Sequence, residues 1–259
     1  MTKELSVNKL WNDIYKQRQS KYYPRPSLNR VDFEMEKIFR QFLPIKKGLN
    51  FIEIGCGDSY WLPYFCKEFG YTIHGIDYSA EGINKARENL QINELYNYEA
   101  NLYCLDFLNL KKDFSSGFDI LMSLGVIEHF EEPKEIIKIF ANFIREEGIM
   151  ITWIPNKSGL IMKMQKTLNR NFYDTHKAIT LDQLIKYHEI NGLKIISSSY
   201  NRILDLSILN FSNFTPGVAR FIEKLVALFN LPILAASKYL NYKIESAKLS
   251  SAMYVIARK

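Results

Sequence analysis

Cysteine is scarce in this chain, which contains three such residues among 259. Cys56, Cys66 and Cys104 cannot all pair, and their spacing is not that of a metal site. Neither a disulfide framework nor a cysteine-bound metal is therefore expected. We interpret the thiols as small apolar side chains in the core of a protein from a reducing cytoplasm.

Long hydrophobic runs are also absent. The longest, residues 225–236, is interrupted by Asn230 and Pro232 and is too short to cross a bilayer. No N-terminal segment joins a basic start to an apolar stretch and a small-residue cleavage site, so we expect no secretory signal. These absences predict a cytoplasmic protein.

Acidic residues are few in the second part of the chain. Residues 156–259 contain 15 Lys and Arg against 6 Asp and Glu, a net +9, whereas residues 1–155 contain 19 against 22, a net −3. A basic face attracts nucleic acid, anionic lipid or phosphorylated substrates, and it can also be no more than a solvated surface. An RNA-directed enzyme is a hypothesis that rests on this charge alone.

The remaining composition is that of a folded domain. The apolar share of 47% and the aromatic share of 14% exclude a disordered chain, and the length suits one α/β domain with additions. Apolar runs predict strands at 50–54, 71–76, 98–105, 118–123, 148–154, 193–199 and 252–258. Helical spacing and capping residues predict helices at 3–20, 31–43, 59–69, 79–92, 133–146, 180–191, 216–229 and 232–247. The alternation implies a parallel, doubly wound sheet.

The most informative segment joins the first two strands. Residues 51–59 form an apolar run that ends in a Gly-x-Gly turn, and Asp77 ends the second strand, where its carboxylate can accept hydrogen bonds from a ribose diol. A dinucleotide fold has a third glycine where this chain has Tyr60, and Asp58 would repel a pyrophosphate. Both residues suit a cationic nucleoside without phosphate. S-adenosylmethionine is such a ligand, with an ammonium group that Glu53 can hold.

At this point the chain resembles the class I S-adenosylmethionine-dependent methyltransferases, in their small-molecule branch. The resemblance is carried, in family order, by FIEIGCGDS (51–59), HGIDYS (74–79), CLDF (104–107), FDILMSLGVIEHF (118–130) and GIMITWIPN (148–156). It covers residues 48–156 well and the rest only by topology. Ser59 departs from the pattern, because many members have a third glycine there.

The resemblance implies an α/β fold with a mostly parallel seven-stranded sheet, an antiparallel last strand and a helical insertion. We expect a single domain over 1–259. Its expected parts are an N-terminal helical cap (1–47), a cofactor-binding core (48–156) and two insertions over the acceptor side (156–179 and 200–250). The second insertion is a candidate lid, homodimer interface or peripheral membrane surface, and packing on the sheet edge is the alternative.

The resemblance also implies a site for S-adenosylmethionine. Glu53 is expected to hold the methionine ammonium and Asp77 the ribose hydroxyls, with helix capping as the alternative for Asp77. Asp106 is expected to accept the adenine amino group, with a surface-loop role as the alternative. The other expected cofactor contacts are Gly55, Cys56, Gly57, Tyr78, Phe107 and Leu124.

Two histidines are candidates for the catalytic base. His129 follows the fourth strand and His176 lies in the first insertion, and an imidazole titrates near neutral pH. Packing is the alternative role for His129. Glu128 is a conceivable metal ligand, but no cluster of carboxylates accompanies it, so we expect no metal site. The expected substrate contacts are Tyr22, Arg25 and Tyr173.

Two nucleic-acid signatures are missing. Residues 123–126 read Ser-Leu-Gly-Val where nucleobase amino-methyltransferases have Asn/Asp-Pro-Pro-aromatic, and no Pro-Cys nucleophile is present. Nucleic acid is therefore not the expected partner. We predict a methyltransferase for a small-molecule or lipid-linked hydroxyl of sugar, quinone or natural-product type. The alternatives are an N-methyltransferase on an amino sugar and a non-catalytic binding module that retains the fold.

Overall fold

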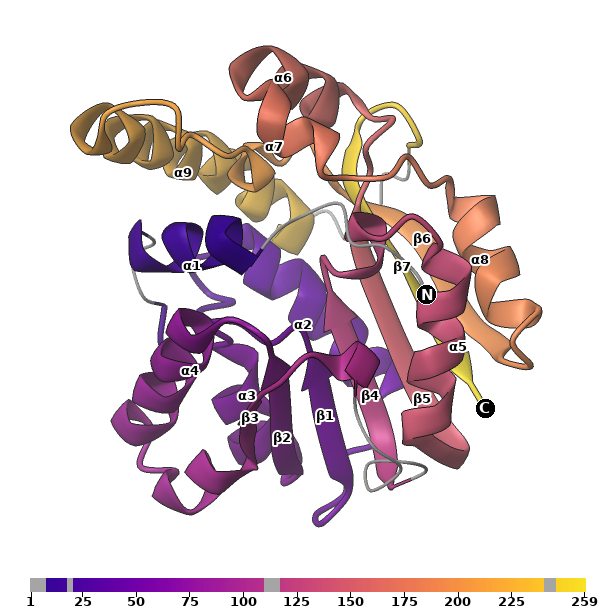
Figure 1. Ribbon diagram of the computed structural model, residues 1–259. Helices are drawn as coiled ribbons and strands as arrows, with labels where there is room; N and C mark the ends of the chain where they lie inside the picture. The colour runs from indigo at the N-terminus through magenta and orange to yellow at the C-terminus, as the bar shows by residue number, and fades with distance from the viewer. Residues whose placement is uncertain (1–7, 18–20, 110–116, 240–245) are drawn as a thin grey trace.

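A seven-stranded sheet forms the centre of the protein. The computed structural model describes residues 8–17, 21–109, 117–239 and 246–259 (Figure 1). The strands are β1 (Asn50–Ile54), β2 (Thr72–Asp77), β3 (Leu102–Cys104), β4 (Phe118–Leu124), β5 (Ile144–Pro155), β6 (Lys194–Ile203) and β7 (Ser250–Arg258). Their order is β3-β2-β1-β4-β5-β7-β6, and β7 runs antiparallel to both of its neighbours. The expected doubly wound α/β fold with an antiparallel last strand is confirmed.

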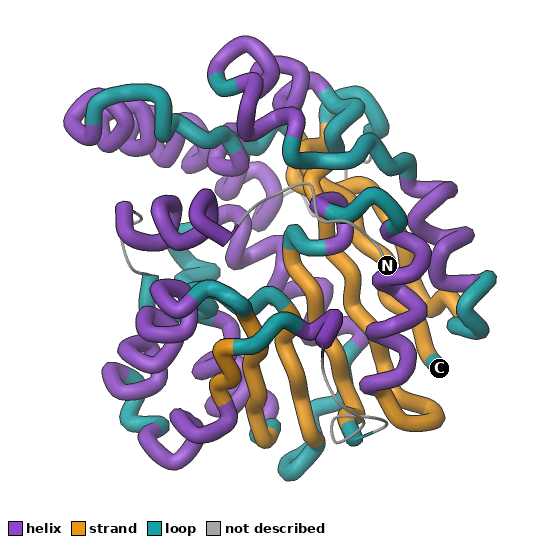
Figure 2. Tube along the Cα trace, viewed as in Figure 1, coloured by secondary structure: helices purple, strands orange, loops and turns teal. Residues whose placement is uncertain are grey.

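Helices cover both faces of this sheet (Figure 2). The α-helices are α1 (Asn8–Gln17), α2 (Arg30–Phe42), α3 (Trp61–Tyr64), α4 (Ala80–Ile92), α5 (Pro133–Phe143), α6 (Leu160–Leu168), α7 (Arg170–Asp174), α8 (Leu181–Glu189) and α9 (Pro216–Tyr239). A π-helical turn, η1 (Phe65–Phe69), continues α3. Short 3₁₀ turns are η2 (Tyr96–Asn101), η3 (Phe107–Asn109), η5 (Ile127–His129) and η6 (Leu206–Ile208).

The core has two layers because β1 is apolar on both faces. Phe51 points to one face and stacks on Phe65 at 4.4 Å between ring centroids, in a cluster that includes side chains from α2, α3 and α4. Ile52 points to the other face and packs with Phe140 of α5 and Leu184 of α8. Burial on both faces explains why the parallel strands appear as continuous apolar runs in the sequence.

The predicted strand at 98–105 is wrong in its first part. Residues Tyr96–Asn101 form the turn η2, and β3 contains only residues 102–104. The three residues directly before Leu102 are Glu99, Ala100 and Asn101, which favour strands poorly. The Asn101 side chain instead donates a hydrogen bond to the Ile73 carbonyl at 3.0 Å, which joins the turn to β2.

The predicted break in the second insertion is also wrong. One helix, α9, runs from Pro216 to Tyr239 with Pro232 inside it, where two helices were expected. Residues 240–245 of the second expected helix lie outside the described residues, as do residues 3–7 and 18–20 of the first expected helix of the chain. Within the described ranges, every helix is too short or too polar to cross a membrane.

Candidate functional site

A cavity of about 510 Å³ opens at the carboxyl ends of the central strands. Glu53 from β1, Asp77 from β2 and Leu124 from β4 all line it. The chain leaves β1 toward β2 and β3 on one side, and β4 lies on the other side, so the cavity sits where the winding of the sheet reverses. This is the usual place for a ligand in an open α/β sheet.

The turn after β1 requires its two glycines. Gly55 has φ +70°, and a Cβ there would lie 2.3 Å from a methyl carbon of Val126. Gly57 has φ +48°, and a Cβ there would lie 2.1 Å from the hydroxyl oxygen of Tyr15. At both positions the positive φ and the lack of room for a Cβ exclude residues other than glycine. The contact with Tyr15 also places the turn close against α1.

Asp77 ties this turn to the end of β2. One carboxylate oxygen accepts from the Gly57 backbone N–H at 2.8 Å and the other accepts from the Ser79 N–H at 2.7 Å. The cap of α4 belongs to Ser79, whose hydroxyl accepts from the Gly82 N–H at 3.1 Å. The carboxylate thus faces the cavity from a position fixed by two backbone donors, and its role toward a ribose remains the expectation from the sequence.

Glu53 is almost fully enclosed, with 3% of its surface exposed. Burial raises the pKa of its carboxyl from 4.5 to about 8, the charges of Asp58 and Asp77 add to this, and a hydrogen bond from Ser59 opposes it. The Ser59 hydroxyl donates to Glu53 at 2.5 Å and accepts from the Trp61 N–H at the start of α3. The serine that departs from the family pattern therefore positions the carboxylate, and a bound cation would favour its ionised form.

Less polar side chains also line the cavity. Tyr78, Phe107 and Cys56 line it, and Phe107 packs edge-on against Phe130 at 5.6 Å between centroids. Asp106 does not reach the cavity wall. Its carboxylate accepts from the Leu108 N–H at 2.9 Å and from the Asn109 amide at 2.8 Å, which matches the surface-loop alternative.

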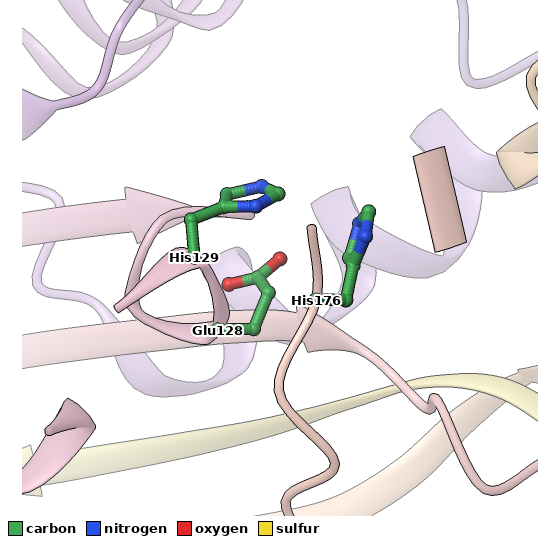
Figure 3. A group of neighbouring side chains, drawn as sticks. All are labelled: Glu128, His129 and His176. Carbon is green, nitrogen blue, oxygen red and sulfur yellow. The ribbon is translucent and has the colours of Figure 1, made fainter. Parts of the chain in front are cut away.

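Three buried side chains gather at the far end of the cavity. Glu128 and His129 lie on η5, just after β4, and His176 follows α7. The two imidazole rings are 4.6 Å apart between centroids in an edge-to-face arrangement. In Figure 3 the carboxylate of Glu128 lies below the ring of His129 and to the left of His176. The structure therefore brings the two predicted bases together, although 47 positions separate His129 from His176 in the sequence.

Hydrogen bonds to the main chain join the loop that carries Glu128 and His129 to the loop that carries His176. The Lys177 N–H donates to the Glu128 carbonyl at 2.6 Å, and Nδ1 of His129 lies 2.9 Å from the Thr175 carbonyl oxygen. Nδ1 of His176 lies 2.9 Å from the Phe172 carbonyl oxygen. Each imidazole is thus oriented by a main-chain acceptor, so its position does not depend on a mobile side chain.

Burial governs the protonation of this group. It lowers the pKa of His129 to about 4, against the opposing effect of the Thr175 and Gly125 carbonyls. Burial, with a smaller contribution from the neighbouring His129, lowers the pKa of His176 to about 3. Burial also raises the pKa of Glu128 to about 8. At neutral pH both imidazoles are therefore neutral, and a proton in this group resides on Glu128.

Helix α1 forms part of the roof of the cavity. Trp11 lies edge-on to His129 at 5.1 Å between centroids, and Tyr15 covers the glycine turn. The Ser79 hydroxyl donates to the Asn12 side chain at 2.6 Å, which joins α1 to the start of α4. The sequence places Trp11 and Tyr15 on one helical face, and only the folded arrangement shows that this face meets the cavity.

The three expected substrate residues lie away from the cavity wall. Tyr22 is 41% exposed, and its carbonyl accepts from the Asn93 amide at 2.9 Å. The side chain of Arg25 is exposed. The ring of Tyr173 lies 4.3 Å from the Lys157 ammonium. Their roles toward a substrate are not supported by any contact with the cavity. Other polar side chains of the described residues line it instead, namely Lys21, Asn29, Tyr60 and Arg202.

Both insertions contribute residues to the wall of the cavity. Phe172 and His176 come from the first, and Arg202, Ser207 and Ile208 come from the second. Helices α6, α7 and α9 lie together at the top of the view in Figure 1, beyond the carboxyl ends of the strands. The outer face of α9 carries exposed large apolar side chains, namely Val218, Phe221, Leu225, Leu228, Phe229 and Leu231.

Comparison with known proteins agrees with this architecture. The family model described as a methyltransferase domain matches residues 45–206. A ubiquinone biosynthesis O-methyltransferase from Colwellia psychrerythraea is 26% identical over 200 residues, which cover 71% of this chain and 79% of that protein. One of the same description from Coxiella burnetii is 28% identical over 158 residues, or 58% of this chain and 65% of that protein. The chain spans less than half the length of two further such relatives.

A solved structure gives the same result for the fold. A SAM-dependent methyltransferase from Archaeoglobus fulgidus superposes with a TM-score of 0.55 at 19% identity, covering 88% of this chain and 94% of that one. The glycine turn, the buried Glu53 and the oriented Asp77 occur in the part of the chain that the family model matches. The chain belongs to the class I S-adenosylmethionine-dependent methyltransferases.

Proposed function

We propose that this enzyme transfers the methyl group of S-adenosylmethionine to a hydroxyl group of a small-molecule or lipid-linked acceptor of quinone type. The observation that carries the proposal is that one cavity joins the cofactor motif to Glu128, His129 and His176. The names of the relatives from Colwellia and Coxiella, which are O-methyltransferases, support the choice of oxygen.

The cofactor residues act through position and charge. In this proposal Glu53 binds the methionine ammonium, Asp77 the ribose hydroxyls, and Tyr78 and Phe107 flank the adenine. The backbone at Gly55 and Gly57 allows close approach, and Cys56 and Leu124 complete the wall. The methyl group would then point toward the acceptor end of the cavity. Alignment of donor and acceptor is the main contribution an enzyme makes to such a displacement.

The acceptor hydroxyl must lose its proton as it reacts. Its oxygen bonds to the methyl carbon, the carbon–sulfur bond breaks, and the electron pair returns to sulfur, which leaves neutral S-adenosylhomocysteine. We assign the proton to His129 or His176, whose neutral rings can accept it, with Glu128 as its final site because Glu128 has the highest pKa of the three. The turnover rate should therefore rise with pH until Glu128 is ionised, near pH 8.

Turnover of a panel of phenols, hydroquinones and amino sugars tests the proposal. The purified chain is incubated with S-adenosylmethionine and each compound, and the methylated atom is located by NMR. Methyl ethers are expected. Products methylated only at nitrogen would replace the proposal with its alternative, an N-methyltransferase.

Two alanine variants test the base. If one imidazole accepts the proton, its loss should lower kcat by about 10²–10⁴-fold, and loss of the other should have a smaller effect. The variants are His129→Ala and His176→Ala, with His74→Ala as control because His74 does not line the cavity. Equal and modest losses in both variants would exclude either histidine as the base.

A further inference from the structure

Glu128, next to His129 in the cavity, is a buried carboxylate whose place in the fold has no structural reason. Both of its carboxylate oxygens are buried and have no hydrogen-bond partner among the residues that the structure describes, and the residue is 1% exposed. A buried polar group without a partner costs free energy, and an unpaired buried charge costs much more. The chain therefore retains a carboxylate in a place where a neutral apolar side chain would be more stable, which points to a partner that the described residues do not provide.

The two neighbouring histidines present the matching donor atoms. A carbonyl oxygen can only accept, so the carbonyls of Thr175 and Phe172 hold the proton of each neutral imidazole on Nδ1. The lone pair of each ring is then on Nε2. Histidines that bind metals in proteins have this arrangement, with the second ring nitrogen donating to a carbonyl or carboxylate.

The three groups are close enough to share one ion. One ligand atom from each of Glu128, His129 and His176 lies within 4.8 Å of the others. Ligand atoms bound to a tetrahedral ion at roughly 2.0–2.2 Å are about 3.4 Å apart. Side-chain rotations that move these atoms by about 1 Å would therefore bring them to bonding distance from one ion. Figure 3 shows the three side chains directed into one common space.

We propose that Glu128, His129 and His176 bind a divalent first-row transition-metal ion at the acceptor end of the cavity. Two imidazoles and one carboxylate suit zinc, iron(II), cobalt(II) or manganese(II), whereas magnesium and calcium favour sites made of oxygen alone. Three protein ligands leave coordination positions open, as in catalytic sites of this kind. The sequence predicted no metal because no cluster of carboxylates accompanies Glu128, and His176 is distant from the other two ligands along the chain.

This inference deepens the proposed function and rests on it for its chemical role. The acceptor hydroxyl oxygen would occupy an open position, and the cation would lower its pKa so that the proton leaves to solvent. The resulting oxygen anion takes the methyl carbon, the carbon–sulfur bond breaks, and its electron pair returns to sulfur. The metal ion is neither oxidised nor reduced. With the ion bound, the imidazoles hold the cation and solvent takes the proton. The assignment of the proton to His129 or His176 then applies to the metal-free enzyme alone.

Metal titration of the full chain tests the site without any acceptor. The protein is treated with a chelator, dialysed and titrated with cobalt(II) and with zinc(II) by calorimetry, and the visible absorption of cobalt(II) reports its ligands. The variants are Glu128→Gln and His176→Ala. The matched controls are Cys104→Ser, which removes an exposed thiol, and His74→Ala, which removes a histidine outside the cavity. Binding of S-adenosylmethionine is measured on each variant.

The parent protein is expected to bind one ion per chain. In Glu128→Gln and in His176→Ala the affinity for the ion should fall by more than about 10–100-fold, which is the loss typical when a residue that only hydrogen-bonds to a metal ligand is removed. The controls should retain the affinity of the parent protein. No binding by a protein that still binds S-adenosylmethionine would overturn the metal site and leave the proposed function standing. Binding that survives in both variants would mean an adventitious ion only. Failure to bind S-adenosylmethionine in the parent protein would instead contradict the proposed function.

Discussion

Replacement of Glu53 by glutamine should make the unliganded protein more stable and the cofactor complex weaker. The raised pKa of about 8, against 4.5 for an ordinary glutamate, means that the folded state binds a proton which the unfolded state releases. Ionised Glu53 therefore costs folding free energy that is absent below pH 4.5, grows as pH rises and reaches its full value above pH 8. Glutamine is neutral at every pH and keeps an oxygen that can accept from Ser59.

The size of the effect follows from the shift in pKa. One pKa unit corresponds to about 1.4 kcal/mol, so Glu53→Gln should raise the free energy of unfolding by about 1 kcal/mol at pH 5 and by about 4 kcal/mol at pH 8. Urea unfolding followed by tryptophan fluorescence at both pH values measures this difference. The control is Glu132→Gln, because Glu132 is exposed and should respond equally at both pH values.

Calorimetry on the same variant measures the other half of the prediction. A hydrogen bond to a charged group contributes about 1.5–3 kcal/mol, so Glu53→Gln should weaken S-adenosylmethionine binding by about 10–100-fold at pH 8. The reasoning is refuted if the variant gains the same stability at pH 5 and pH 8, because the carboxylate would then not carry a raised pKa. Unchanged affinity for the cofactor would show that Glu53 does not bind its ammonium group.

Three further substitutions probe the same end of the cavity. Asp77→Ala should weaken cofactor binding by about 1–3 kcal/mol in calorimetry, and unchanged affinity would mean that the ribose site is misassigned. Gly57→Ala should reduce cofactor affinity because its Cβ would lie 2.1 Å from the Tyr15 hydroxyl. The double variant Gly57→Ala/Tyr15→Ala should recover part of that affinity. If it recovers none, the loss comes from the positive φ at residue 57 and not from the contact with Tyr15. Ser59→Ala should move the pH at which cofactor affinity falls upward, because the Ser59 hydrogen bond lowers the pKa of Glu53; an unmoved profile contradicts this.

The strands next to the site were predictable because their signals are local. The continuous apolar runs of β1, β4 and β5 and the Gly-x-Gly turn depend on neighbours in sequence, and the sheet confirms them. The strand predicted at 98–105 failed where tertiary contacts decided the outcome, since the Asn101 amide binds β2. The proline at 232 was also overestimated as a break, because α9 continues through it.

The residues of the site also differ in whether the sequence predicts their positions. Glu53 and Asp77 belong to a motif of fixed spacing, so their approach to one cavity could be predicted. The meeting of Glu128 with His176 could not, because it depends on two loops joined by the hydrogen bond from the Lys177 N–H to the Glu128 carbonyl. The position of Tyr15 over the glycine turn likewise depends on how α1 packs, which its own helical pattern does not specify.

The place of β7 in the sheet has a consequence for synthesis of the chain. β7 follows β6 in sequence but lies between β5 and β6, and it pairs with both. During translation β5 and β6 leave the ribosome before the strand that joins them exists. Until residues 250–258 emerge, β5 presents an open edge and β6 lacks its partner, so a nascent or C-terminally truncated chain would expose strand edges that favour aggregation.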